Sequence, residues 1–418
     1  MTMNAKRRRA HQKLAALPGV RPVRRPVCAV GGEQFDLYYV RTGRKSAHPV
    51  VVIPGGPGAA SVALYRGFRR RAAAAGLEVI MVEHRGVGLS RHDDAGADLP
   101  PEALTIDKVV DDIVAVLDDA RVERATLYGT SYGTYIAAGV GVRHPERVHA
   151  MILDSPLLSN RDIEDVREAL RAALWDGEGP DTAELAPKVR RLVNDGVLTP
   201  SAGQIAAAVY GLGGAELLNR QLDLLLRGRS WLWTGLMGFA RVLFQRKAPY
   251  RNEADLVGRI GFRELNYGGV PDGQPLDPAI AFRELGGDLG DFEAEPYDLV
   301  AEMPKFSWPT VVVSGAHDLT TPPSVAARIA ALIPGAVLVS LPTAGHSALD
   351  SRERVALAVA QAVRDDQVGG LPARAAQLDA LPGPAAIRLF IGALRAATAV
   401  EAALPAVVPR AVQRVITS

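Results

Sequence analysis

Short apolar runs alternate with amphipathic segments through the first 156 residues of the chain. The run PVVVI at residues 49–53 is rich in β-branched side chains, as expected of a strand buried on both faces. Residues 106–119 repeat apolar side chains with helical spacing, and the apolar strand from residue 125 leads through a sharp turn into another helix. This alternation predicts βαβ units and a mostly parallel sheet.

The alternation stops after Asp154 and resumes with the buried run PTVVVSG at residue 309. The segment between them is helical in pattern, with breaks at Gly and Pro and no strong strand. A parallel sheet interrupted in this way predicts one domain with an inserted helical cap. We therefore expect a core over residues 27–156 and 301–365 and a cap over residues 157–300.

The two ends of the chain depart from this pattern. Residues 1–26 carry eight Lys and Arg residues and no acidic residue, which predicts a basic flexible arm, and the first strand is expected only from Val27. Residues 366–418 form an extension rich in Ala and Pro, with an amphipathic helix expected over residues 384–403. We expect this helix to pack back on the core. Weak contact with a membrane surface is the alternative.

Composition narrows the class of protein. Apolar residues make up 48% and charged residues 22% of the chain, as in a globular protein with a large core. A formal net charge of +2 gives no support to a nucleic-acid partner. The single Cys28 rules out an internal disulfide, and we see no secretory signal and no run long enough to span a bilayer. These features predict a cytoplasmic protein without an integral membrane segment.

The candidate chemistry centres on the turn GTSYG at residues 129–133. A serine between a strand and a helix, with glycine two positions before and after it, is the pattern of a nucleophile elbow. The glycines let the neighbouring backbone pass close to the turn, because a side chain there would clash. Ser131 is therefore the candidate nucleophile, at the N-terminus of a helix whose free N–H groups favour a developing oxyanion.

A serine nucleophile needs a base and a carboxylate that orients the base. In a parallel sheet these groups gather where strands end. Asp318 follows the strand TVVVSG and His346 follows the strand AVLVSLP, so we expect them to complete a triad with Ser131. Asp154, which also ends a strand, is the alternative acid. The remaining histidines lack metal-ligand spacing, and we expect neither a metal nor a cofactor.

An oxyanion hole requires two convergent donors. The backbone N–H of Tyr132, directly after the nucleophile, supplies the first. The second is expected from the loop PGGPG after the strand that ends at Ile53. We favour Gly56 over Gly55 as its donor.

Four motifs together resemble the α/β-hydrolase superfamily: PGGPG at 54–58, EHRGVGLS at 83–90, GTSYG at 129–133, and GAHD with AGHS around Asp318 and His346. Within it they are most similar to the prolyl aminopeptidase (proline iminopeptidase) type of serine peptidase. Pro54 stands where that family usually has histidine, and Glu83-His84 where it has Asp-Gln. Tyr132 after the nucleophile is more like the related tripeptidyl aminopeptidases.

The resemblance implies the α/β-hydrolase fold and an acyl-enzyme mechanism that releases N-terminal residues from small peptides. It also implies a cap carboxylate for the substrate's amino group, and Glu264 resembles that residue. An ester or lactone hydrolase with an apolar cap is the alternative, which the apolar segment around Trp231 and Trp233 favours. A non-catalytic binding protein of the same fold is a third hypothesis. The oligomeric state is left open.

Overall fold

The computed structural model describes residues 4–404 except 29–30, 180, 246–247 and 288. Eight strands form a single sheet in the order β1-β2-β4-β3-β5-β6-β7-β8. The strands are β1 (Val20–Pro26), β2 (Gln34–Thr42), β3 (Val50–Ile53), β4 (Val79–Val82), β5 (Ala125–Thr130), β6 (Val148–Asp154), β7 (Thr310–Gly315) and β8 (Val337–Leu341). The sheet confirms the predicted fold class.

Strands β3 to β8 run parallel to one another, whereas β2 pairs antiparallel with β4 and β1 pairs antiparallel with β2. In the centre, Gly129 of β5 pairs with Ile53 of β3 on one side and with Leu153 of β6 on the other. The carboxyl ends of the parallel strands therefore meet at one edge of the sheet. The loops that carry the predicted chemistry all start from this edge.

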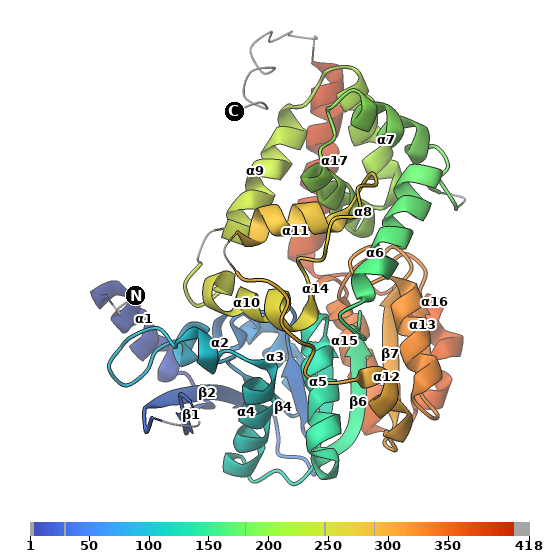
Figure 1. Cartoon of the computed structure of the whole chain (residues 1–418). Coiled ribbons are helices and arrows are strands. Elements are labelled where there is room, and N and C mark those ends of the chain that lie inside the picture. Colours follow the sequence, from blue (N-terminus) through green and yellow to red (C-terminus); the bar gives the residue numbers. More distant parts are fainter. Residues whose placement is uncertain (1–3, 29–30, 180, 246–247, 288, 405–418) are drawn as a thin grey trace.

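Helices cover both faces of the sheet (Figure 1). Helices α4, α5 and α13 enclose one apolar cluster, and α3, α15 and α16 enclose a second cluster on the opposite face. The bounds are α2 (Ser61–Leu64), α3 (Arg66–Ala74), α4 (Ile106–Asp119), α5 (Tyr132–Arg143), α12 (Leu299–Glu302), α13 (Pro323–Leu332), α14 (Ala348–Ser351), α15 (Glu353–Arg364) and α16 (Ala375–Asp379). Helix α4 begins where the Thr105 hydroxyl accepts the Lys108 N–H, a standard N-cap.

A helical insertion separates β6 from β7. Its helices are α6 (Asp162–Arg171), α7 (Leu185–Asn194), α8 (Pro200–Leu226), α9 (Trp231–Gln245), α10 (Ala254–Leu265) and α11 (Pro278–Gly286). Helices α7, α8, α9 and α11 lie at the top of Figure 1, whereas α10 lies lower, next to the core. Helices α6 to α9 share a buried apolar cluster that also takes in Leu319, the residue after Asp318. The insertion thus has its own core and packs against a loop at the carboxyl edge of the sheet.

The N-terminal segment differs from the predicted flexible arm. Residues Ala5–Ala15 form helix α1, and Val20–Pro26 form β1, so the first strand begins before Val27. Arg24 pairs with Asp36 and Asp94, and Arg25 pairs with the buried Asp112. The basic side chains lie on an edge strand and have acidic partners from distant parts of the chain. Prolines at positions 22 and 26 obscure the strand in the sequence, although edge strands tolerate proline.

The C-terminal extension contains helix α17 (Ala385–Ala403), close to the predicted helical range. It packs on α8 and α9 of the insertion (Figure 1). The prediction that this helix packs on the core is therefore wrong. Gln221 of α8 donates a hydrogen bond to Thr398, and the Glu401 carboxylate accepts the Trp231 and Leu232 N–H groups at the start of α9. The helix returns to the insertion because its buried polar residues find their partners there.

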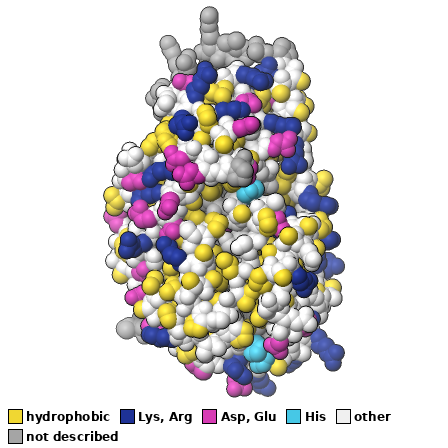
Figure 2. Space-filling view, turned by 90° about the vertical axis from the view of Figure 1, so that its right-hand side faces the viewer, with side chains coloured by type: hydrophobic (Ala, Val, Ile, Leu, Met, Phe, Trp, Pro, Cys, Tyr) yellow, Lys and Arg dark blue, Asp and Glu magenta, His cyan; other side chains and the backbone are white. Residues whose placement is uncertain are grey.

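No helix among the described residues combines the length and apolar character needed to cross a membrane. Figure 2 shows positive and negative side chains interspersed over one side of the molecule, in agreement with the small formal net charge.

Candidate active site

Ser131 occupies a strained turn between β5 and α5, with φ 52° and ψ −124°. A side chain at Gly129 would overlap the backbone of Gly133, and one at Gly133 would overlap the carbonyl oxygen of Ile53 in β3. Both glycines are needed because helix α5 crosses directly over the strand ends. The local structure is therefore the predicted elbow, and strain of this kind at a non-glycine residue is typical of functional positions.

Asp318 and His346 come from the loops after β7 and β8 and lie together. His346 Nδ1 is 2.9 Å from Asp318 Oδ2 and 3.2 Å from Oδ1. The Asp318 carboxylate is fully buried and also accepts the N–H groups of Thr320 and Thr321 and the Thr321 hydroxyl. An aspartate held in this way fixes the orientation and tautomer of the imidazole, leaving Nε2 free to act as a base.

The electrostatics of this pair suit a base and its partner. Burial disfavours the charged form of His346, but the adjacent Asp318 carboxylate outweighs burial and raises the pKa of the imidazole above its usual value. Burial likewise opposes the charge on Asp318, yet the pairing with His346 and the hydrogen bonds from Thr320 and Thr321 hold its pKa below the usual range. Asp318 is accordingly ionised at neutral pH.

The Ser131 hydroxyl and His346 share no hydrogen bond among the contacts of the described residues. The two loops are nevertheless joined by a hydrogen bond of 3.0 Å. Thr130, the residue before Ser131, donates it to the hydroxyl of Ser347, the residue after His346. The Ser347 N–H donates in turn to Ser155 at the end of β6. Nucleophile–base hydrogen bonds are often long without substrate and tighten in its complex.

Asp154, the alternative acid, has a different task. Its buried carboxylate accepts the N–H groups of Ala348 and Leu349 at the start of α14 and the hydroxyl of Tyr128. These contacts hold the segment directly after His346. Asp154 is a positioning residue for the base loop, a role the sequence did not reveal, although its place at a strand end had marked it.

The two predicted oxyanion donors lie beside the elbow. Tyr132 is the first residue of α5, so its backbone N–H has no acceptor within the helix. Gly55 lies directly against the nucleophile, since a methyl group on it would sit 3.0 Å from Ser131 Cβ and 3.7 Å from its Oγ. Gly56, the favoured donor, has φ +123° and shapes the same turn. The choice between the two glycines stays a prediction.

The Tyr132 side chain points into the core, where its hydroxyl lies 3.1 Å from His84 Nε2. Burial lowers the pKa of His84 to about 4, so the imidazole is neutral at neutral pH. This contact ties the EHRGVGLS loop to the residue after the nucleophile. It gives His84, which departs from the family pattern, a structural role.

Helix α8 of the insertion touches the loops of both the acid and the base. A side chain on Gly345, the residue before His346, would overlap the backbone of Gly211 in α8. The Tyr210 ring lies 4.6 Å from the ring of His317, whose Nε2 is 3.3 Å from Asp181. His317 directly precedes Asp318 in the sequence. The insertion therefore lies over the carboxyl edge of the sheet, as a cap over a site would.

Glu264, Trp231 and Trp233, the three residues that the sequence associates with the substrate, lie in different surroundings. The buried Glu264 carboxylate accepts the Ile106 N–H at the start of α4 and pairs with Arg263, and burial raises its pKa. Trp233 is buried in the core of the insertion, whereas Trp231 is 53% exposed. All three side chains thus have structural surroundings or face solvent.

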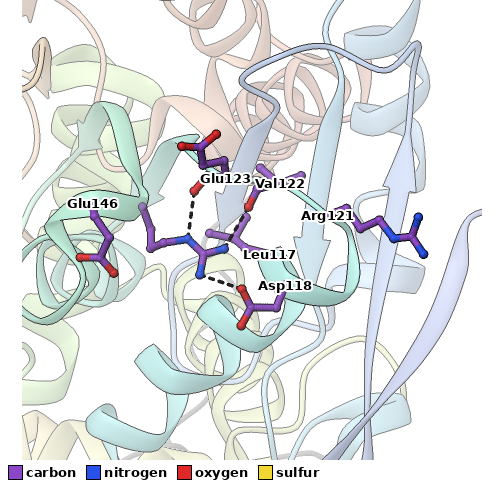
Figure 3. A pocket seen from close by; sticks show the side chains of 7 residues that line it. Leu117, Asp118, Arg121, Val122, Glu123 and Glu146 are labelled. Carbon is purple, nitrogen blue, oxygen red and sulfur yellow. Dashed lines mark hydrogen bonds and ion pairs between the residues drawn. The ribbon is translucent and has the colours of Figure 1, made fainter.

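Within the described part of the chain, no group of three or more His, Cys, Asp and Glu side chains is arranged to hold a metal ion. A hollow of about 460 Å³ lies where α4 ends and β5 begins, at the opposite end of the sheet from Ser131. The Arg147 guanidinium donates hydrogen bonds to Asp118 and to the backbone carbonyl groups of residues 122 and 123. In Figure 3 the Arg121 side chain points away from Asp118. These hydrogen bonds engage the Arg147 guanidinium and the Asp118 carboxylate, and the distance of the hollow from Ser131 separates it from the candidate triad.

Comparison with known proteins agrees with this geometry. Residues 48–197 match the sequence family described as the alpha/beta hydrolase fold. A proline iminopeptidase of Neisseria meningitidis is 23% identical over 339 residues, which cover 80% of this chain and 93% of that protein. A rhodomycin D methylesterase of a Streptomyces species is 27% identical over 323 residues, covering 77% and 92% of the two chains.

Among solved structures, a proline iminopeptidase of Mycobacterium smegmatis superposes with a TM-score of 0.50 at 19% identity. The match covers 84% of this chain and all of the other. At this identity the likeness concerns the fold alone. The order of the strands, the elbow at Ser131 and these likenesses identify the chain as an α/β-hydrolase-fold protein that resembles the proline iminopeptidases.

Proposed function

We propose that the chain is a serine hydrolase in which Ser131, His346 and Asp318 form a catalytic triad. The observation that carries the proposal is the buried Asp318–His346 pair, which lies at the same sheet edge as the strained Ser131 turn. The Thr130–Ser347 hydrogen bond joins the two loops immediately beside the nucleophile and the base. The proposal is supported because a serine nucleophile needs a base and a carboxylate that orients the base.

In the proposed reaction, His346 Nε2 takes the Ser131 proton as Oγ attacks the substrate carbonyl. The backbone N–H of Tyr132 and a glycine N–H of the 54–58 loop stabilise the oxyanion. The imidazolium then gives its proton to the leaving group, and an acyl-enzyme remains on Ser131. Water, activated by the same imidazole, releases the acid and restores the serine.

The proposed substrates are small peptides or amino-acyl amides that lose their N-terminal residue. Support comes from relatives named proline iminopeptidase that align over four-fifths of this chain. Such a substrate needs a carboxylate for its amino group. Glu295 is a better candidate than Glu264, because it is only half-buried and its two oxygens accept from neutral groups, the Tyr135 hydroxyl and the Asn160 amide.

A carboxylic ester is the second candidate substrate. The observation that favours it is that both candidate amine ligands already have partners: Glu264 contacts Ile106 and Arg263, and Glu295 contacts Tyr135 and Asn160. The alignment with a methylesterase over most of both chains points the same way. Ester hydrolysis would use the same triad without an amine-binding carboxylate.

A substrate panel separates the two candidates. The wild type and Ser131→Ala are assayed with prolyl and other amino-acyl chromogenic amides and with short p-nitrophenyl esters. Amide turnover that the variant lacks supports the peptidase assignment, and Glu295→Gln should then raise KM for substrates with a free amino group more than for N-acetylated ones. Ester turnover without amide turnover assigns an esterase. Equal rates for wild type and Ser131→Ala on every substrate would exclude the proposed nucleophile.

A further inference from the structure

Helix α17 has a second apolar face, which points away from the insertion. Its inner face carries Leu394, Thr398 and Glu401, all buried against the neighbouring helices. Its outer side is exposed over a stripe spaced at one helical turn. The stripe consists of Leu389, Ala393, Ala396, Val400 and Leu404. A helix that is apolar on both sides is unusual at a protein surface, because a solvated face normally carries polar side chains.

Helix α9 widens this surface. It runs alongside α17 in the opposite direction, since Trp231 contacts Glu401 at one end and the Phe239 ring lies 6.3 Å from the Phe390 ring further along. The surface, called here the α9–α17 face, comprises Trp231, Phe239, Leu389, Phe390, Val400 and Leu404, each at least 41% exposed. Clusters of exposed large apolar side chains on this scale mark interaction sites.

The charged side chains that α17 exposes have one sign. Arg388 and Arg395 are exposed on α17, and because they are seven residues apart they lie along the same side of the helix. Glu401 is the one acidic residue in the sequences of the two helices, and it points inward, where its carboxylate accepts the N–H groups that begin α9. The face therefore offers aromatic and aliphatic side chains flanked by positive charge.

This chemistry decides between two kinds of occupant. A second copy of the chain would add two further arginines to the interface, with no exposed acidic side chain on the described part of either helix to pair with them. A bilayer that contains anionic lipid would accept Trp, Phe and Leu at its interface and pair the arginines with phosphate groups. We propose that the α9–α17 face binds the surface of anionic membranes.

The test is co-sedimentation of the full chain with phosphatidylcholine vesicles, with and without phosphatidylglycerol. We expect binding to the anionic vesicles that weakens with added salt. The double variant Leu389→Ser/Phe390→Ser should lose most of it, and Arg388→Gln or Arg395→Gln should each weaken it about fivefold. Val270→Ser is the matched control, because Val270 is 76% exposed in the loop between α10 and α11, outside this face. The unfolding temperature of each variant, and its labelling at Ser131 by a fluorophosphonate probe, show that it is folded.

Two outcomes would overturn the proposal. One is that the wild type does not bind the anionic vesicles, or that the double variant binds them as well as the wild type does. The other is that light scattering shows a dimer which the double variant dissociates, because a second copy would then cover the face.

Discussion

Gly211 of helix α8 and Gly345 of the base loop meet backbone to backbone. A methyl group on Gly345 would overlap the Gly211 carbonyl and come within 2.7 Å of its Cα. A methyl group on Gly211 has more room, with its nearest neighbours at 3.3 Å (the His317 carbonyl oxygen) and 3.6 Å (Gly345 Cα). The insertion thus contacts Gly345, the residue before His346, so closely that Gly345 cannot carry a side chain.

This asymmetry predicts different effects for two alanine substitutions. Gly345→Ala should displace the base loop and lower kcat by about a hundredfold, as a misplacement of about 1 Å does elsewhere. Gly211→Ala should lower kcat far less, because its methyl group requires the His317 carbonyl group to shift only slightly and because alanine favours a helix. Steady-state kinetics on the best substrate give the comparison. Equal losses in the two variants would mean that the contact does not position His346.

The raised pKa of His346 predicts the acid limb of the pH profile. Only the neutral imidazole accepts the Ser131 proton, so kcat/KM should fall as pH drops through a value above 6.5, the ordinary pKa of histidine. Asp318→Asn removes the charge that raises this pKa. The limb should therefore move to lower pH, and the rate should drop about 10⁴-fold. An unshifted limb in Asp318→Asn would assign the titration to another group.

Asp154 should matter through the loop that follows His346. In Asp154→Ala the Ala348 and Leu349 N–H groups and the Tyr128 hydroxyl lose their buried acceptor. Unsatisfied buried groups of this kind cost about 1–3 kcal/mol of unfolding free energy. We expect that loss in urea unfolding, together with a lower kcat at little changed KM.

Tyr128→Phe serves as the control for Asp154, since it removes one hydrogen bond to the carboxylate and leaves the α14 contacts in place. It should be close to wild type in kcat. A fall in kcat as large as that of Asp154→Ala would show that general destabilisation, and not the position of the base loop, explains the effect.

The N-terminal helix should contribute to stability through Arg7. Its guanidinium pairs at 2.5 Å with Glu253, a fully buried carboxylate that also accepts the Gly88 N–H. Burial, together with the nearby Glu253, raises the pKa of Glu83 to about 7. Negative charge is therefore unfavourable in this region unless a cation such as Arg7 compensates for it. Arg7→Ala would leave Glu253 without its cation and should cost about 3–5 kcal/mol. Urea unfolding is measured for this variant and for Arg9→Ala, whose side chain is exposed on the same helix. Equal unfolding free energies for the two variants would mean that the segment behaves as a free arm.

Much of the architecture follows from the sequence because parallel strands leave a strong signal. The runs at β3 and β7 are β-branched and buried throughout, and chain order then places Ser131, Asp318 and His346 after strands whose carboxyl ends share one edge. The glycines of the elbow were predictable for the same reason, because a turn of that shape excludes side chains.

The parts that escaped prediction depend on long-range partners. Arg7, Arg24 and Arg25 look like a solvated charge run, since Glu253, Asp94 and Asp112 lie far along the chain. The apolar side chains on the inner face of α17 fit any apolar surface, so the sequence does not identify the partner. The buried Thr398 and Glu401 of this face have their hydrogen-bond partners, Gln221 and Trp231, in the insertion. Glu264 resembles a substrate ligand by its neighbours in sequence, and its hydrogen bond from the Ile106 N–H at the start of α4 is a long-range contact that the sequence does not indicate.

The central claim is that Ser131 is a nucleophile activated by His346. Intact-mass spectrometry after treatment with a fluorophosphonate probe tests it without knowledge of the substrate. We expect a single adduct that peptide mapping places on Ser131, absent in Ser131→Ala and formed about three orders of magnitude more slowly in His346→Ala. A wild-type protein that stays unmodified, or an adduct that persists in Ser131→Ala, would contradict the account and favour a binding protein built on a hydrolase fold.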